Sequence, residues 1–277
     1  MIGKIIIHHM RNNILAIPDV HGRIFWKEPV KKYWDVVDRV VFLGDYLDPY
    51  PDEDGVADDI FENMMEIVEL KRNNKEKVVL LKGNHDQHYA SKRFEEQAAG
   101  TRMDYQNWNQ YHQAFNENKE LFQIAHMEMV NGVPYIFTHA GLTLYWLKKV
   151  NDNLWNLFDH QISVADPEII ERINLLDDDG KGQDLLATIG KRRSWFGEKT
   201  GSVLWADIDE HALAHAPKAY GLDKVFQVFG HTKLDEGCDM IEFDHLAMID
   251  SRQCFMIDKS MKERIISVSR LCHTRQG

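Results

Sequence analysis

Five short apolar runs in the sequence each end in side chains that can bind a metal ion. The runs are residues 13–19, 39–45, 77–84, 133–140 and 224–231. Each run is typical of a buried strand bounded by turn residues. The side chains at their ends are Asp19 with His21, Asp45 with Asp48, Asn84 with His85, His139, and His231. Ligands of an open α/β sheet bind beyond the carboxyl ends of its strands, so we expect these side chains to converge at one edge.

Turn chemistry explains only part of this pattern. Asn and Asp tolerate unusual backbone angles, so Asp19, Asp45 and Asn84 could serve as turn residues alone. The same reasoning does not explain His139 and His231, each of which ends an otherwise apolar run. One such strand end would be a coincidence, whereas five of them predict a metal site.

The composition fits an enzyme of ordinary size. A length of 277 residues and 44% hydrophobic content allow a large core. The formal net charge of −11 disfavours nucleic acid as a partner, because nonspecific binding to phosphate backbones depends on clustered Lys and Arg. Three cysteines without Cys-x-x-Cys spacing predict neither a disulfide framework nor a thiolate zinc site. No run approaches the roughly 20 apolar residues of a membrane helix. We therefore expect a cytoplasmic protein without a membrane partner.

The first half of the chain alternates strands with helices, which is typical of an α/β protein. Residues 57–74 and 107–125 have the apolar spacing of helices. The segment 141–223 is mostly helical or irregular and is expected to be a helical insertion or cap, in which residues 177–184 form an exposed loop. The runs "LAMIDS", "CFMID" and "RIISVSR" after it predict closing antiparallel strands. No repeat or linker divides the sequence, so residues 1–277 are expected to form a single domain.

The strand ends carry ordered motifs that resemble those of a known enzyme family. The motifs are "PDVHGR", "GDYLD", "GNHD", "THAGL" and "FGHT", and they span residues 18–232. In this order they resemble the calcineurin-like metallophosphoesterases, especially the phosphoprotein phosphatase branch with its GDxHG, GDxxDRG, GNHE, HGG and GHT signatures. "GSVLWADID" and "AMIDSRQCF" are similar to two later elements of that branch. The resemblance implies a four-layer α/β/β/α sandwich of two mixed sheets flanked by helices.

The resemblance also implies two divalent metal ions. Carried over motif by motif, the first ion is held by Asp19, His21 and Asp45, and the second by Asp45, Asn84, His139 and His231. Asp45 would bridge two cations about 3.5 to 4 Å apart, whose repulsion needs a shared anion. Carboxylate, imidazole and amide ligands without thiolate suit manganese, iron or zinc, of which we expect manganese. Asn84 supplies an oxygen ligand without adding a negative charge.

The family mechanism assigns further roles to the same motifs. A metal-bound water or hydroxide attacks phosphorus in line, and His85 protonates the leaving oxygen. Asp48 would orient His85 and keep it protonated. Asp86 stands where the branch usually has Glu and is expected to hold a loop or a ligand in place. His88 is expected to lie at the surface.

One position departs from the phosphatase branch. Pro49 follows "GDYLD", where the branch has an arginine that grips phosphate. Because a guanidinium suits phosphate oxygens well, another arginine is expected to bind the substrate, with Arg193 preferred and Arg23 as the competing choice. Arg192 is expected to be a solvated surface charge.

The most favoured function is that of a phosphatase acting on phosphate monoesters and resembling the serine/threonine phosphatases. Its substrate would be a phosphoprotein, a small phosphate ester or a nucleotide. The alternative enzyme is a nucleotide or dinucleoside polyphosphate hydrolase of the same superfamily. A noncatalytic binding module is disfavoured because every expected ligand and the His85–Asp48 pair are present, and a nuclease is disfavoured by the acidic charge balance.

Overall fold

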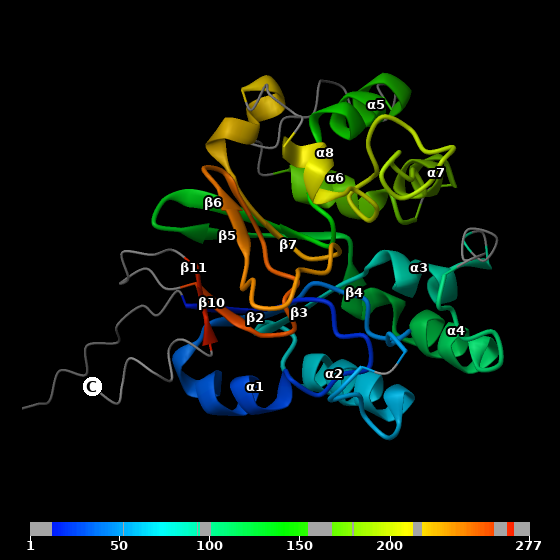
Figure 1. Cartoon of the computed structure of the whole chain (residues 1–277), viewed down its shortest axis with the longest axis vertical. Helices are drawn as coiled ribbons and strands as arrows, with labels where there is room; N and C mark the ends of the chain where they lie inside the picture. Colours follow the sequence, from blue (N-terminus) through cyan, green and yellow to red (C-terminus); the bar gives the residue numbers. More distant parts are fainter. Residues whose placement is uncertain are drawn as a thin grey trace, which may run out of the picture.

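Two β-sheets lie face to face at the centre of the molecule, with helices on both outer faces (Figure 1). The computed structural model describes residues 13–51, 53–92, 94, 101–154, 168–178, 180–212, 218–257 and 265–268. The predicted architecture of two mixed sheets flanked by helices is confirmed.

The first sheet has six strands in the order β11-β10-β1-β2-β3-β4. Their bounds are β1 (Ile14–Ile17), β2 (Arg39–Phe42), β3 (Val78–Leu81), β4 (Phe122–Gln123), β10 (Phe255–Ile257) and β11 (Ile265–Ser267). Strands β1 to β4 are parallel, whereas β10 and β11 are antiparallel to their neighbours. The carboxyl ends of β1, β2 and β3 therefore reach the same edge of the sheet.

The second sheet has five strands in the order β5-β6-β7-β9-β8. Their bounds are β5 (Ala125–Val130), β6 (Val133–Thr138), β7 (Phe226–Phe229), β8 (Ile241–Phe243) and β9 (Leu246–Met248). Strands β6, β7 and β9 run parallel, and β5 and β8 are antiparallel to them. This sheet brings the ends of β6 and β7 to the side on which β1, β2 and β3 end.

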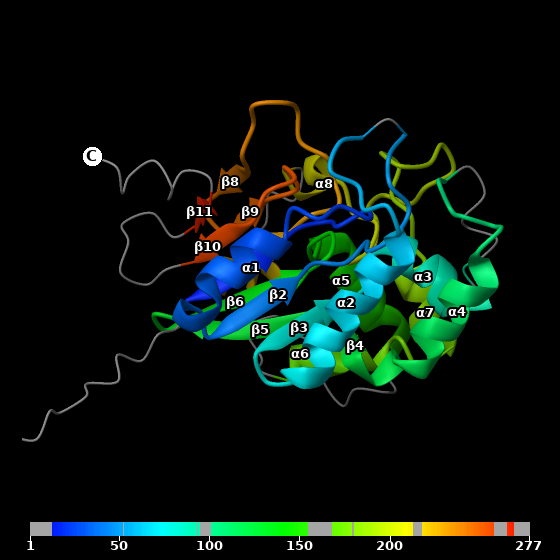
Figure 2. The same ribbon diagram turned by 90° about the horizontal axis from the view of Figure 1, so that it is seen from below.

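Eight α-helices are present in the described residues. They are α1 (Lys27–Tyr33), α2 (Ile60–Asn73), α3 (Asn84–Ala90), α4 (Trp108–Glu117), α5 (Leu144–Leu154), α6 (Ile169–Leu175), α7 (Gly180–Leu186) and α8 (Ile208–Ala212). Short 3-10 helices cover η1 (Trp34–Val36), η3 (Lys119–Leu121) and η4 (Ala219–Lys224). Figure 2, seen from below, shows α1 and α2 lying across the strands of the first sheet.

Three buried clusters separate the four layers. Successive side chains of a strand point to opposite faces, so Leu15 and Ile17 pack with helices α1 and α2, while Ile14 and Ala16 lie in the core between the sheets. A third cluster packs α5, α6 and α7 on the outer face of the second sheet. Both sheets are thus covered, which is why central strands such as β1 and β3 are apolar along their whole length instead of alternating with polar residues.

Some predicted elements differ from the structure. The helix expected over residues 107–125 ends at Glu117, where Asn118 donates a hydrogen bond to the carbonyl of Ala114 (2.8 Å). The chain then enters β4, because Phe122 pairs with Leu80 of β3. The strand predicted at "LAMIDS" exists, but it runs parallel to β7 instead of antiparallel.

The segment 141–223 lies between β6 and β7, and its described part contains α5, α6, α7 and α8. Its helices form the outer layer on the second sheet. The loop expected at 177–184 is wrong from Gly180 onward, where α7 begins. The single-domain organisation stays a prediction. None of the helices in the described ranges combines the length and the apolar character that crossing a membrane requires.

Candidate metal centre

The first group of predicted ligands meets beyond the ends of β1 and β2. Nε2 of His21 lies 3.5 Å from Oδ2 of Asp45 and 3.9 Å from Oδ2 of Asp19. All three residues are buried. Their ligand atoms lie within 4.8 Å of one another, which is the spacing of a shared metal ion.

The second group meets beyond the ends of β3, β6 and β7. Nε2 of His139 lies 3.0 Å from Oδ1 of Asn84 and 3.0 Å from Nδ1 of His231. The same nitrogen is 3.5 Å from Oδ2 of Asp45. Asp45 therefore belongs to both groups, which is the position of a carboxylate that bridges two ions.

Backbone carbonyls orient two of the imidazole rings. The carbonyl of Leu47 accepts from Nδ1 of His21, and the carbonyl of Leu43 accepts from Nδ1 of His139, both at 2.9 Å. With the proton on Nδ1, each Nε2 presents a lone pair to the cluster, as metal-binding histidines do. Nε2 of His139 then faces the amide oxygen of Asn84, so two acceptors approach without a hydrogen between them. A cation at this point satisfies both, and the residues present fit a divalent metal.

The charges of the cluster lead to the same conclusion. Burial raises the pKa of Asp45 well above its usual value, and the neighbouring carboxylate of Asp19 raises it further. Burial also lowers the pKa values of His21, His139 and His231, which are neutral imidazoles at pH 7. Among the described residues, no Lys or Arg forms an ion pair with the carboxylate of Asp45 or Asp19, whose partners are histidines. Divalent cations would supply the positive charge and favour the ionised form of Asp45.

The backbone is strained where the ligands leave the strands. Residues with positive φ include His21 (45°), Asp45 (52°), Asp48 (59°) and His231 (69°). Side chains other than glycine rarely adopt this conformation, and it concentrates at functional sites whose surroundings enforce it. The strain turns these side chains toward the cluster instead of along the strand direction.

Two motif glycines leave room for the aspartate ligands. A Cβ at Gly83 would lie 2.0 Å from Oδ1 of Asp45, and a Cβ at Gly230 would lie 2.2 Å from Oδ1 of Asp19. Any side chain at either position would displace a carboxylate. The glycines of "GNHD" and "FGHT" are therefore required by the ligands packed against them.

Asp86 holds two motif loops together. Its carboxylate accepts backbone hydrogen bonds from Gly83 (2.7 Å), Asp45 (2.7 Å) and Tyr46 (3.0 Å). It has no solvent exposure, and burial raises the pKa of Asp86 to about 7 despite these three donors. The loop that carries Asp45 is thereby fixed against the turn that carries Asn84.

The carboxylate of Asp48 holds His85 beside the predicted ligands. Oδ2 of Asp48 lies 2.6 Å from Nδ1 of His85, and the hydroxyl of Tyr89 donates to Oδ1 of the same carboxylate. The His85 ring meets the ring of His21 edge-on, with centroids 5.2 Å apart. The Nε2 side of His85 is thus free of Asp48 and adjacent to the cluster. Tyr89 has no recognisable motif, and the sequence alone did not point to it.

His88 is not at the surface, so that expectation was wrong. Its exposed fraction is 1%, because α3 turns the ring inward between His85 and Trp205, at centroid distances of 5.6 and 5.9 Å. Neither ring nitrogen of His88 has a hydrogen-bond partner in the described part of the chain. Burial lowers the pKa of His88 to about 3. The ring is a neutral wall of the site.

The two arginines considered for substrate binding occupy different environments. Arg23 is 3% exposed, and its three guanidinium nitrogens donate to the carbonyls of Val20 and Asp19 and to the carboxylate of Glu53. These contacts favour a structural role for Arg23, so the competing choice finds no support in the geometry. Arg193 donates to the hydroxyl of Thr232 (2.6 Å), next to the ligand His231.

Arg193 retains access to the centre. It also lies 3.1 Å from Oδ2 of Asp207, and its side chain is 28% exposed. Its charge contributes to the low pKa values of His139 and His231, which places it close to the second group of ligands. Arg192, by contrast, has a side chain that is 55% exposed, as expected for a solvated charge.

A third arginine, Arg102, lies at the opposite side of the centre. Its Nη2 is 3.5 Å from Nε2 of His21, and its Nε donates to the carbonyl of Asp48 (3.1 Å). No motif surrounds Arg102 in the sequence, so no local pattern identifies it.

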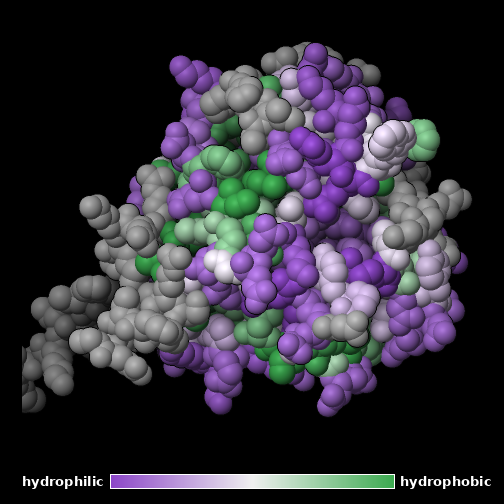
Figure 3. Space-filling view, viewed as in Figure 1, coloured by the Kyte–Doolittle hydropathy of each residue, from purple (hydrophilic) through white to green (hydrophobic). Residues whose placement is uncertain are grey.

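Trp205 and Trp195 differ sharply in their exposure. Trp205 is buried, and its ring centroid lies 6.1 Å from that of His231. Trp195 is 94% exposed. Figure 3 shows hydrophilic side chains around a hollow between the upper helical layer and the lower part of the molecule.

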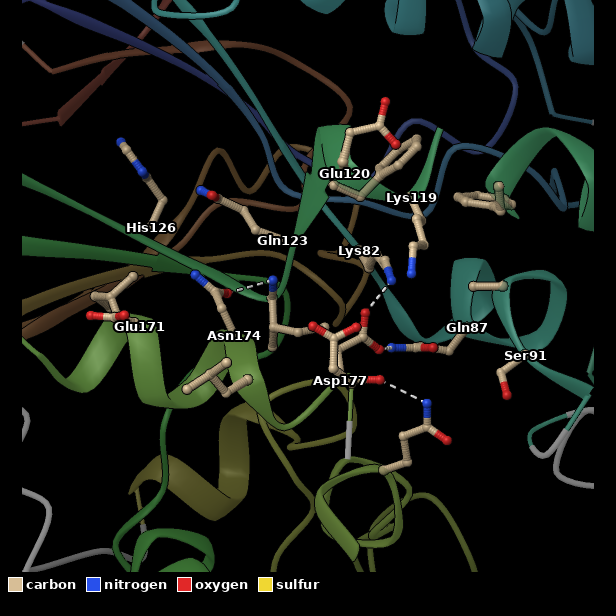
Figure 4. A pocket seen from close by; sticks show the side chains of 18 of the residues that line it. Lys82, Gln87, Ser91, Lys119, Glu120, Gln123, His126, Glu171, Asn174 and Asp177 are labelled. Carbon is tan, nitrogen blue, oxygen red and sulfur yellow. Dashed lines mark hydrogen bonds and ion pairs between the residues drawn. The ribbon is translucent and has the colours of Figure 1, made fainter. Parts of the chain in front are cut away.

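A separate cavity of about 910 Å³ lies between α3, α4, α6 and α7 and is lined by none of the predicted metal ligands. Figure 4 shows Lys82 and Gln87 pointing toward Asp177 from the opposite wall. Lys82 pairs with Asp177, and Gln87 donates to it (2.8 Å). Because Lys82 and Gln87 flank Asn84 and His85 in the sequence, Asp177 anchors the turn behind the metal centre. It had been expected in an exposed loop.

Comparisons with known proteins give one family and one fold. Residues 13–235 match the sequence profile of the calcineurin-like phosphoesterases. A cold-active protein tyrosine phosphatase shares the fold with a TM-score of 0.51 and 15% identity, over 92% of this chain and 77% of that chain. A protein serine/threonine phosphatase from Saccharomyces cerevisiae gives a TM-score of 0.51 and 15% identity, over 94% of this chain and 80% of that chain. At this identity the likeness shows the fold alone. No curated protein sequence matches this chain.

Proposed function

The chain belongs to the calcineurin-like phosphoesterase family, and on that premise we propose that it is a metal-dependent phosphatase acting on phosphate monoesters. One observation carries the proposal. Two buried ligand groups share Asp45, and His85 stands beside them with its Nδ1 held by Asp48. A metal-activated hydrolase needs both parts, the ligands for its cations and a group that can protonate the leaving oxygen.

The metal ions have a defined role in this proposal. When bound, two divalent cations supply the Lewis acidity that activates water and offsets charge on the phosphoryl oxygens. Asp19, His21 and Asp45 would hold one ion, and Asp45, Asn84, His139 and His231 the other. We propose manganese as the native metal, because the ligand set contains no thiolate and combines carboxylates with imidazole and an amide oxygen.

His85 provides the proton for the leaving group. Its Nδ1 hydrogen bonds to Asp48, so Nε2 is the nitrogen that faces the substrate. Asp48 is itself held by Tyr89, which prevents the carboxylate from rotating away. General acid catalysis of this kind contributes about 10² to 10⁴ in rate.

The charges at the mouth of the site suit an anionic substrate. The whole chain has a formal net charge of −11. Even so, Arg102 and Arg193 lie on opposite sides of the centre, and Lys233 lies near Arg102 across the ring of Tyr50. A local cluster of cations concentrates phosphate esters at the metals against the unfavourable charge of the protein as a whole.

Among monoesters we propose a serine/threonine phosphatase-like specificity. The motif order supports it, and the yeast serine/threonine phosphatase shares the fold. The alternative is a nucleotide or dinucleoside polyphosphate hydrolase of the same family.

A substrate panel tests these proposals. Manganese-loaded protein would be assayed with a phosphoserine peptide, p-nitrophenyl phosphate, bis-p-nitrophenyl phosphate and diadenosine tetraphosphate. We expect the two monoesters to give the highest kcat/KM. A higher kcat/KM for diadenosine tetraphosphate would support the polyphosphate hydrolase instead of the phosphatase. No turnover together with fewer than two manganese ions per chain would favour a noncatalytic binding module.

A further inference from the structure

Pro49 cannot bind phosphate at the position that follows Asp48. It directly follows Asp48 and has neither a charged side chain nor a backbone N–H, so it cannot donate to a phosphoryl oxygen. The neighbouring structure shows what occupies this side of the centre. Arg102 lies on this side of the centre, next to Asp48.

Arg102 is held at the first ligand group by the backbone beside Pro49. Its Nε donates to the carbonyl of Asp48 (3.1 Å), and its Nη2 lies 3.5 Å from Nε2 of His21. Nε2 is the nitrogen that His21 presents to the metal cluster. The guanidinium therefore reaches the metal-facing side of the ligand shell from a segment far along the chain.

The ring of Tyr50 fixes the plane of this guanidinium. The Cζ atom of Arg102 lies 3.6 Å from the centroid of the Tyr50 ring, which is a close cation–π contact. The ring also meets His21 edge-on at 5.3 Å, and Nζ of Lys233 lies 4.6 Å from its centroid. Tyr50 is thus a platform that holds two cations next to a metal ligand.

Within the part of the chain that the structure describes, Arg102 has no anionic partner of the kind that comparable arginines have. Arg23 pairs with Glu53, Arg39 with Glu128, and Arg193 with Asp207. In the described ranges no carboxylate pairs with Arg102. Arg102 is partly buried and shares the ring of Tyr50 with Lys233, an arrangement of two cations that an incoming anion would stabilise.

We propose that Arg102 is a substrate-binding residue that grips the phosphoryl oxygens from the His21 side, in place of the arginine absent at Pro49. This inference rests on the proposed phosphatase function and extends it. Arg193 would contact the same phosphoryl group from the His231 side. Two guanidinium groups need two free oxygens besides the one that faces the metals, so the pair favours a terminal phosphate over a diester.

The test measures phosphate binding directly. Manganese-loaded wild type, Arg102→Ala and Arg102→Lys would be titrated with inorganic phosphate by isothermal titration calorimetry, with metal content measured on each sample. The matched control is Arg72→Ala, because Arg72 pairs with Glu69 on the surface of α2, away from the site. We expect Arg102→Ala to weaken phosphate binding about 10-fold to 100-fold, as for loss of a charge-assisted contact, with metal content unchanged. Arg102→Lys should recover part of the loss, and the control should match wild type.

Added guanidinium ion separates a binding role from a folding defect. In Arg102→Ala it should restore part of the phosphate affinity, and it should do nothing for the control. Phosphate affinity of Arg102→Ala within twofold of wild type, at equal metal content, overturns the inference.

Kinetics distinguish this inference from the proposed function. With p-nitrophenyl phosphate, Arg102→Ala should raise KM more than it lowers kcat. If wild type hydrolyses no monoester but Arg102→Ala still weakens phosphate binding, the phosphatase function fails and the assignment of Arg102 as an anion-binding residue stands. If wild type is an active phosphatase and Arg102→Ala keeps its KM and phosphate affinity, the assignment of Arg102 alone fails.

Discussion

Oδ2 of Asp48 lies 2.6 Å from Nδ1 of His85, and this one contact couples the second motif loop to the first turn of α3. The carbonyl of the same Asp48 accepts from Arg102, and its Oδ1 accepts from Tyr89. Asp48 therefore positions both the proposed acid and the proposed phosphate-binding arginine. Asp48 holds these three partners with a positive φ of 59°, a conformation that side chains other than glycine rarely adopt.

Replacing His85 should impair chemistry and leave the metals in place. We expect His85→Ala to lower kcat by about 10² to 10⁴, because the proton for the leaving oxygen is lost. Esters with a leaving group of low pKa should suffer least, since they depart without a proton. A series of aryl phosphates, with metal content by mass spectrometry, measures this. Loss of one metal ion with high residual activity would make His85 a ligand instead.

Replacing Asp45 should empty both metal positions. Its Oδ2 lies 3.5 Å from Nε2 of both His21 and His139, so this one carboxylate oxygen is a candidate ligand in both groups. We expect Asp45→Ala to bind no manganese after chelation and reloading and to show no activity. Asp38→Ala, a change at an exposed position, should bind as wild type does. Retention of one tightly bound ion by Asp45→Ala would mean that the carboxylate does not bridge.

Gly83→Ala should abolish metal binding through a steric clash alone. The new Cβ would lie 2.0 Å from Oδ1 of Asp45, and the backbone there needs no positive φ. Gly55→Ala is the converse control, with open space around the Cβ but a φ of +75°. We expect Gly55→Ala to cost about 1 kcal/mol of unfolding free energy and to keep its metals. Calorimetric manganese titration and denaturant unfolding compare the two variants, and normal manganese affinity in Gly83→Ala would contradict the geometry.

His211 should make the protein less stable at acid pH. Burial lowers the pKa of His211 to about 4, and its ring stacks on Phe229 with Nε2 2.8 Å from the carbonyl of Ala140. Between pH 6.5 and 4 the unfolded chain binds a proton that the folded chain does not, so stability falls as pH falls through this range. At pH 5, protonation of His211 in the unfolded chain should lower the unfolding free energy by on the order of 2 kcal/mol relative to neutral pH.

Urea unfolding in the presence of a chelator isolates this effect from metal binding. The unfolding free energy of wild type should drop more steeply from pH 7.5 to 5 than that of His211→Gln, whose side chain does not titrate. Parallel pH profiles for the two proteins would show that His211 does not control the acid response.

The sequence by itself identifies the strands and the side chains at their ends. A buried strand needs only a short apolar run, and the residue that follows it is set by chain order, so Asp19, Asp45 and Asn84 can be placed from local pattern. The parallel order of β1, β2 and β3 then brings them to one edge. Register and pairing are less local. The strand β4 and the parallel pairing of β9 depend on which neighbour offers free backbone groups, which no single segment specifies.

Tertiary structure alone decides the surroundings of those side chains. Arg102 meets His21 although 81 positions separate them, and Asp177 meets Lys82 across 95 positions. The local sequence predicts neither contact, because the residues around an arginine do not indicate whether it is partly buried or at the surface. Arg23 lies two positions after the predicted ligand His21 in the sequence, yet the fold gives it Glu53 as a partner. Motif spacing determines which atoms can bind metal, while the burial and pairing of every other charge depend on contacts that form only when distant segments pack together.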